Sequence, residues 1–286
     1  MLVYFADHFR PDAASRGASG RRCAAVGRVR FALPALAIYL LLAVLIGPRA
    51  ANATDFYEIQ IYSFDTVPQD QLMAELHLNY VSTAVGMASK SNLPLYQTHA
   101  TYEFTYGLLP YLEVGQYVCT AMFEPGQWEY AGARSKVHFG IPQTADWPVQ
   151  FGANIELQYM RRAAVPDPFN IEFMPIMESH WRRFTAIANL SFEKQFSGPG
   201  TQAGISLEPM GQLSYLLTKW FEPSLEYFGD IGAVKEPYIW PEQQQFIVPA
   251  VNLYLIPQLE FNFGVGFGIT RNQRGTFEKG TIGWLF

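Results

Sequence analysis

The chain has little cysteine, few basic residues and no long apolar run beyond residue 47. Two cysteines, Cys23 and Cys119, occur among 286 residues. If the amino-terminal leader described below is removed, Cys119 remains alone, so no intramolecular disulfide can form and an unpaired buried thiol is expected. The glycine pattern lacks a phosphate-binding loop, because Gly264, Gly266 and Gly268 follow the alternation of a strand.

An export signal precedes the main part of the chain. Residues 31–47 carry no charge, arginines precede them, and the small-x-small sequence Ala51-Asn52-Ala53 follows. This order predicts a leader and signal peptide over residues 1–53, cleaved after Ala53, and a single domain over residues 54–286. An uncleaved membrane anchor is the alternative, since the apolar run approaches the ~20 residues needed to span a bilayer.

Removal of this leader makes the chain strongly acidic. The leader holds seven Arg and two Asp of the 20 basic and 25 acidic residues, which leaves 13 basic and 23 acidic residues in the mature part. Such a balance argues against nucleic acid as a partner.

The carboxy-terminal residues alternate between apolar and small or polar side chains. From Leu259 to Ile269 every second residue is apolar, three of them Phe, and the residues between are Glu260, Asn262 and glycines. In the last strand Ile282, Trp284 and Phe286 share one face. A continuous apolar face opposite small or polar residues is typical of a barrel wall with lipid outside and a lumen inside.

This ending resembles the carboxy-terminal signature of Gram-negative outer-membrane β-barrel proteins. That signature is a terminal Phe preceded at alternate positions by apolar or aromatic residues, and the insertion machinery reads it. Ile282, Trp284 and Phe286 match it, whereas Glu278 and Gly280 depart from it. The resemblance, to a porin-like or transporter-like family, implies a place in the cell outer membrane. It also implies contact with membrane lipid, lipopolysaccharide and the insertion machinery.

Turn residues divide the rest of the chain into short runs with strand character. We predict an all-β protein, an antiparallel transmembrane up-and-down β-barrel of about 12 strands, within a range of 10–14. Bacterial barrels have even strand numbers, so one of the thirteen candidate runs is expected to be a loop segment, or two of them to share one strand. The candidate runs are 56–64, 72–83, 97–107, 111–122, 129–139, 149–160, 171–178, 183–194, 204–216, 220–229, 245–256, 258–270 and 276–286.

Two sets of connections are expected at opposite ends of the barrel. Long extracellular loops are predicted at 90–97, 142–148, 163–170, 196–204 and 232–244, and short periplasmic turns at 107–110, 178–181 and 256–258. Prolines inside the runs, such as Pro175, Pro209, Pro223 and Pro249, are expected at bends, bulges or strand ends.

Carboxylates recur on the faces predicted to line the lumen, together with one histidine. Few basic residues share those faces, and Arg134, Lys136, Arg161 and Arg183 are the candidates. A wet lumen lined by acids would favour cations, whereas a packed lumen would pair these acids internally. The predicted lining residues are Glu75, His77, Glu103, Glu113, Glu156, Glu172, Glu193, Glu208, Glu226 and Glu260.

Catalytic, metal and cofactor sites are not predicted. His77 lies between Glu75 and Asn79 on one strand face, but no nucleophile motif surrounds it. A metal there would need ligands from distant strands.

The sequence therefore favours a passive channel or small-solute transporter with an acidic, cation-favouring lumen. A non-conducting structural or adhesive barrel with partner-binding loops is the main alternative. A soluble periplasmic β-barrel binding an apolar ligand and an outer-membrane enzyme are further ones.

Overall fold

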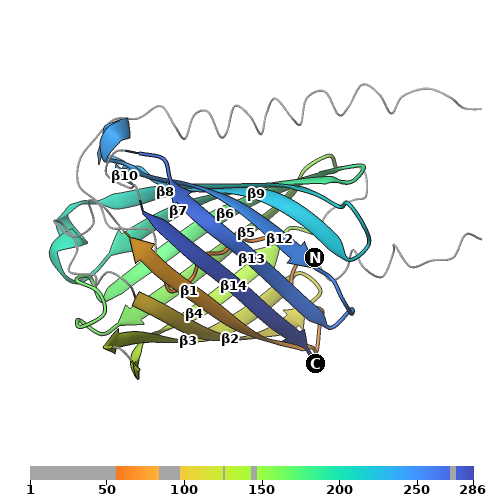
Figure 1. The fold of residues 1–286 in the computed structure, drawn as a ribbon, viewed down its shortest axis with the longest axis horizontal. Coiled ribbons are helices and arrows are strands. Elements are labelled where there is room, and N and C mark those ends of the chain that lie inside the picture. The colour runs from red at the N-terminus through yellow and green to blue at the C-terminus, as the bar shows by residue number, and fades with distance from the viewer. Residues whose placement is uncertain (1–55, 84–96, 125, 143–146, 271–274) are drawn as a thin grey trace, which may run out of the picture.

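A computed structural model describes residues 56–83, 97–124, 126–142, 147–270 and 275–286 of the protein. The predicted leader, residues 1–53, lies outside these described residues. Within them, twelve long strands form one antiparallel sheet that closes into a barrel (Figure 1). The strands are β1 (Leu72–Thr83), β2 (Gln97–Leu109), β3 (Leu112–Glu124), β4 (Gln127–Gly140), β5 (Gln150–Met160), β6 (Phe169–Trp181), β7 (Phe184–Gln195), β8 (Ile205–Tyr215), β9 (Phe221–Asp230), β12 (Gln244–Leu253), β13 (Leu259–Gly268) and β14 (Thr276–Leu285).

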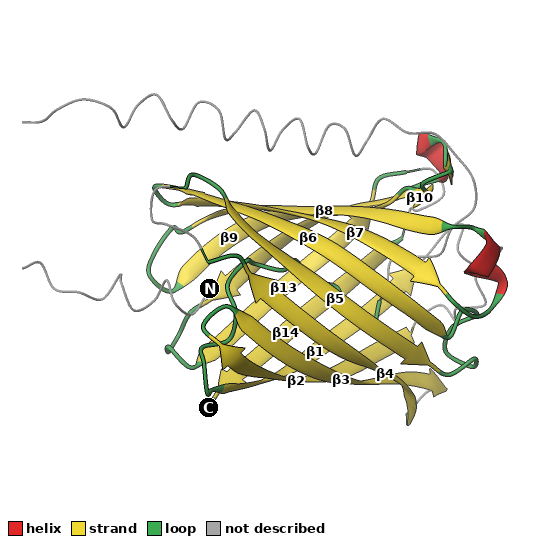
Figure 2. Ribbon diagram, turned by 180° about the vertical axis from the view of Figure 1, so that it is seen from behind, coloured by secondary structure: helices red, strands yellow, loops and turns green. Residues whose placement is uncertain are grey.

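Each strand pairs with its sequence neighbour, and β14 pairs with β1 to close the ring. The closing register runs from Met73 opposite Leu285 to Val81 opposite Phe277. A short hairpin of β10 (Gly232–Ala233) and β11 (Glu236–Pro237) extends beside β8. The predicted fold class and strand number are confirmed, and Figure 2 shows the strands inclined to the barrel axis, as closure requires.

The alternation in the sequence becomes an outer and an inner face of the wall. Exposed apolar side chains such as Phe104, Leu157, Phe263 and Ile282 lie on one side, while residues such as Asn154 on the other are buried. Two short 3₁₀ turns, η2 (Pro199–Gln202) and η3 (Trp240–Glu242), lie in connections. No helix in the described part of the chain is long and apolar enough to cross a membrane.

The two ends of the barrel carry different connections. We call the end that holds Phe286 the C-terminal end and the other the loop end. The 109–112 and 181–184 turns lie at the C-terminal end, and the connections 160–169, 195–205 and 230–244 at the loop end. The connection from β4 to β5 is also at the C-terminal end, so the prediction that groups 142–148 with the extracellular loops is wrong.

Prolines interrupt the hydrogen-bonded ladders without ending the strands. Pro209 and Pro223 lie inside β8 and β9, and the pairing between these strands runs only from Met210 to Ser214 on the β8 side. The β12–β13 pairing is interrupted at Pro249. The cause is the missing backbone donor of proline.

One predicted strand does not belong to the wall. Residues 56–64 are not part of any described strand and run inside the barrel instead. The even strand number predicted that one of the thirteen runs is a loop segment or that two share a strand, and the structure shows that the run 56–64 lies outside the ring.

Candidate functional site: the barrel lumen

An extended segment of the chain's own residues, 56–67, occupies the lumen and is here called the inner segment. Wall side chains bind its backbone in place of a sheet ladder. Asn79 of β1 donates to the carbonyl of Phe56 at 3.0 Å, and Thr101 of β2 donates to that of Tyr57 at 2.8 Å. These bonds satisfy backbone groups that would otherwise be buried without partners.

The clearest of these contacts is formed by Asn189 of β7. Its Oδ1 accepts from the backbone N–H of Tyr62 at 2.8 Å, and its Nδ2 donates to the carbonyl of Tyr62 at 2.9 Å. One amide side chain therefore reproduces the pair of hydrogen bonds that a neighbouring strand would make. The inner segment is held at this point in a fixed register with the wall.

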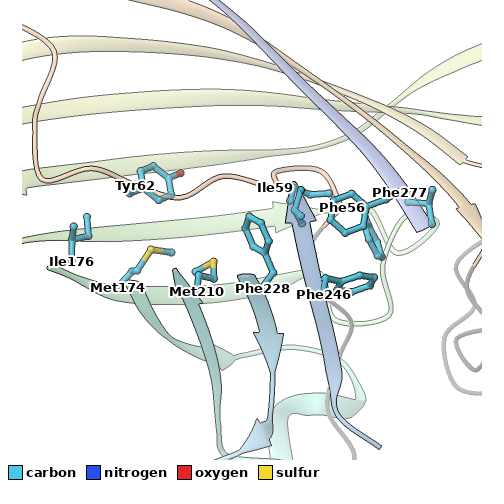
Figure 3. Close-up of a cluster of buried hydrophobic side chains, with 11 residues drawn as sticks. Phe56, Ile59, Tyr62, Met174, Ile176, Met210, Phe228, Phe246 and Phe277 are labelled. Atoms are coloured by element: carbon cyan, nitrogen blue, oxygen red, sulfur yellow. The ribbon is translucent and has the colours of Figure 1, made fainter. Parts of the chain in front are cut away.

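Apolar side chains of the inner segment pack against inward-facing residues of the wall (Figure 3). The ring of Phe56 contacts Phe246 and Phe277 in edge-on geometry, with centroids 6.4 and 5.9 Å apart. Ile59 belongs to the same buried cluster. Tyr57 lies in a second cluster, formed with residues of β3, β4, β5 and the connection after β5, and its ring lies tilted against that of His99 with centroids 4.3 Å apart.

Lys136 is the centre of a buried charge network. Its Nζ lies 2.5 Å from Glu103 Oε1 and 3.2 Å from Glu113 Oε1. His77 Nε2 is 3.0 Å from the other oxygen of Glu103, and His138 Nδ1 is 3.1 Å from Glu113. Two carboxylates, one ammonium and two imidazoles from β1–β4 thus form one connected group.

Two further cations link the inner segment to the wall. Arg134 Nη1 lies 3.0 Å from Glu58 Oε2 of the inner segment and 3.5 Å from Glu156 Oε2. Lys279 Nζ lies 2.6 Å from Glu226 Oε2 and donates to the Ile59 carbonyl at 3.2 Å. Both cations compensate acidic charge inside the barrel and bind the inner segment at the same time.

The residues predicted to line the lumen fall into two groups. The ion-paired members are buried and comprise His77, Glu103, Glu113, Glu156 and Glu226. The others are partly buried, and among the described residues none forms an ion pair with a Lys, Arg or His side chain; these are Glu75, Glu172, Glu193, Glu208 and Glu260.

The strand register brings several of these acids into two rows around the wall. Glu103, Glu75 and Glu260 lie at one level, with Gly283 between the last two. A Cβ at Gly283 would lie 2.9 Å from Glu75 Cγ, so the glycine makes room for this first row. The second row consists of Glu156, Glu172 and Glu193 on β5, β6 and β7.

Sequence reasoning missed several lumen residues and misplaced two cations. Lys279 was overlooked, although it alternates with Phe277 and Thr281 on the inner face of β14. Glu58 was missed because its segment was assigned to the wall. Arg161, in contrast, pairs with Glu129 on the exposed surface, and Arg183 is exposed at a turn.

Comparison with solved structures identifies the architecture. The barrel is similar to the COG4313 outer-membrane channel from Pseudomonas putida F1, with a TM-score of 0.58 and 8% identity over 80% of this chain and 100% of that one. It is similar to the KdgM porin, with a TM-score of 0.51 and 8% identity over 75% and 99% of the two chains. No family model and no curated protein matches.

The protein is an outer-membrane β-barrel of porin-like architecture. The closed ring of twelve strands and its apolar outer face agree with this assignment. The predicted place in the cell outer membrane is thereby confirmed.

A cavity of about 130 Å³ remains beside the inner segment. Residues 59–63 and 65–67 form one side of it, and inward-facing residues of the wall form the rest, among them Glu75, Glu260, Lys136 and Lys279. The lumen is therefore divided between apolar packing around Phe56 and Tyr57 and a polar cavity beside residues 59–67.

One group in this region has ligand atoms close enough for a metal ion. Glu75, His77 and Glu103 offer atoms within 4.8 Å of one another. However, Glu103 already binds both Lys136 and His77, so a cation would compete with an ammonium for the same carboxylate. His77 Nδ1 faces the Thr281 hydroxyl at 3.4 Å, which orients the ring within the wall network.

Proposed function

We propose that the protein is a passive channel for small solutes whose lumen favours cations. The observation that carries this proposal is the pair of carboxylate rows. Among the residues that the structure describes, the Lys and Arg side chains inside the wall are Arg134, Lys136 and Lys279, and each already contacts at least one carboxylate. The acids without such a contact add negative potential in a confined space, which attracts cations.

Glu75 and Glu260 are the most informative residues for a test. Both border the polar cavity, and neither forms an ion pair with a described basic side chain. In contrast, Glu103 and Glu156 contact Lys136 and Arg134, so their substitution would leave a buried cation unbalanced. A change of Glu75 and Glu260 to Gln removes charge and preserves size.

The test is the reversal potential of macroscopic current across a planar bilayer in a KCl gradient. We expect the wild-type protein to favour K⁺ and the E75Q/E260Q variant to lose much of this preference. A unit negative charge about 5 Å from a hydrated cation stabilises it by roughly 0.8 kcal/mol in water, which is about a fourfold enrichment of K⁺ per carboxylate, and it repels Cl⁻ to the same extent.

The matched control is E129Q/E278Q, which removes two charges from outside the lumen. Glu129 pairs with exposed Arg161. Glu278 lies between the inward-facing Phe277 and Lys279 on β14, so its side chain is on the opposite face of the strand. Its reversal potential should equal that of the wild type. An identical reversal potential in E75Q/E260Q would contradict the assigned role of the two acids, and a preference for Cl⁻ would contradict the cation proposal.

A non-conducting structural barrel is the second candidate, and the inner segment favours it. Phe56 and Tyr57 pack within buried clusters that fill part of the lumen. Bilayers that remain sealed with correctly folded wild-type protein, and also with a barrel that lacks residues 56–64, would select this candidate.

A further inference from the structure

We infer that the inner segment is an internal gate, which closes the channel while it lies in the lumen and opens it when it is displaced toward the C-terminal end. The inference rests on the proposed channel function and adds its regulation. It requires an element that can leave without unfolding the wall, a fixed hinge, and a seat shaped for that element. The described residues supply all three.

The inner segment can leave without breaking the ring. None of the strand pairings that close the barrel includes residues 56–67. It is attached by side-chain hydrogen bonds from separate strands, such as those of Asn79, Asn189 and Lys279, and by the buried apolar and ionic contacts described above. Each hydrogen bond of this kind contributes little net free energy, because water replaces it on release. Local opening is therefore far less costly than unfolding of the wall.

The hinge lies between the inner segment and β1. The backbone N–H of Asp70 donates to the Gly107 carbonyl at 2.9 Å, and the N–H of Gly107 donates to the Gln71 carbonyl at 3.1 Å. Asp70 has φ 63°, a left-handed conformation that is uncommon for a residue with a side chain. Because this turn is fixed to β2 at the C-terminal end, the segment can swing out only through that end.

Wall glycines form the seat. A Cβ on Gly107 would lie 2.2 Å from the Pro68 carbonyl oxygen, and one on Gly140 would lie 2.5 Å from that of Phe64. A Cβ on Gly152 would lie 3.4 Å from Phe64 Cα. Backbone approaches as close as the first two exclude any side chain. The strands β2, β4 and β5 thus each have a glycine at the point where the chain before β1 passes closest to them.

The same geometry provides a reversible lock. An ideal Cβ at position 152 lies 3.6 Å from Phe64 Cβ, within the range of about 3.5–4.5 Å that disulfides span. The F64C/G152C variant should therefore form a disulfide that ties the inner segment to β5. Native Cys119 is buried in the wall and can stay in place.

The experiment measures the bilayer conductance of four proteins. Each is first shown to be a folded barrel by a change in its gel mobility on heating. They are the wild type, a deletion of residues 56–64, F64C/G152C before and after reduction, and the wedge variant G140V. The deletion and G140V should conduct several-fold more than the wild type. Oxidised F64C/G152C should conduct less than its own reduced form.

Gly280 offers the matched control for the wedge, because the nearest atoms to a Cβ there are 3.8 Å away. The G280V variant should conduct as the wild type does. The oxidised and reduced forms of F64C/G152C have the same sequence, so they test the gate even if the deletion fails to fold.

The outcomes separate the gate from the channel. Equal conductance of wild type, deletion and both redox forms would overturn the gate and leave the channel standing. Higher conductance of the deletion with no cation preference would support the gate and contradict the charge proposal. Sealed bilayers with every folded variant would overturn the channel, and the gate with it.

Discussion

Arg134 shows how single residues balance the interior of this barrel. Its guanidinium contacts Glu58 of the inner segment and Glu156 of β5, and all three side chains are about 96% buried. Removal of one partner from such a group leaves charge without compensation in a medium of low polarity. The R134M variant should lose about 3–5 kcal/mol of unfolding free energy. Urea titration in detergent micelles, followed by tryptophan fluorescence, measures this loss.

A second substitution separates charge balance from packing. If unpaired acid causes the loss, R134M/E58Q should recover part of the stability. The control is R161M, which breaks an exposed pair with Glu129 and should cost no more than about 1 kcal/mol. Equal losses for R134M and R161M would contradict the importance of burial.

The strands were predictable because lipid and lumen impose a period of two on each of them. Phe263 and Phe267 point outward, and Gly264 and Gly266 inward, as their order along β13 indicates. The inner segment was assigned wrongly for the same reason. An extended chain has this period whether or not it has ladder partners. One sign was available in the sequence. Adjacent residues of a wall strand face lipid and lumen in turn, whereas Phe56 and Tyr57 are both aromatic, and both are buried in the structure.

The sequence predicted which face of the wall the candidate lumen residues occupy, but not which side chains they contact. Alternation placed Glu75 and Glu103 on the inner face, and both are there. It could not indicate that Lys136 reaches from β4 to Glu103, because the two residues are two strands apart and their contact depends on side-chain length and barrel curvature.

At the level of elements, β14 closes the barrel on β1 and leads into Phe286, the predicted insertion signal. The Phe286 backbone N–H donates to the Leu72 carbonyl at 2.8 Å, while its side chain is 69% exposed. If Phe286 is the insertion signal that the sequence predicts, F286A should lower the amount of inserted barrel in cells several-fold. Purified F286A should refold in detergent as well as the wild type, since the backbone bond remains.

The measurement is the heat-modifiable fraction in outer membranes, compared with refolding yield in vitro. Phe263, exposed to a similar degree as other outward aromatics of the wall, supplies the control F263A. Similar insertion of F286A and F263A would contradict a special role of the terminal Phe.

At the scale of the whole molecule, strand number explains why the lumen holds an additional chain segment. Barrel diameter grows roughly linearly with strand number, and about eight strands already enclose a space that side chains fill. Twelve strands therefore enclose more than their own side chains occupy. Here the excess is taken up by the inner segment and by the cavity of about 130 Å³ beside it.

The last prediction concerns where the mature chain begins relative to the inner segment. Cleavage after Ala53 would leave only Thr54 and Asp55 ahead of the Phe56 anchor, so the mature chain would begin almost at the inner segment. Intact-mass measurement of protein purified from outer membranes should give residues 54–286. Signal cleavage requires a small residue at its last position, so A53W should accumulate as precursor while A53G is processed normally. A full-length mass in the outer membrane would contradict cleavage and would favour the uncleaved anchor.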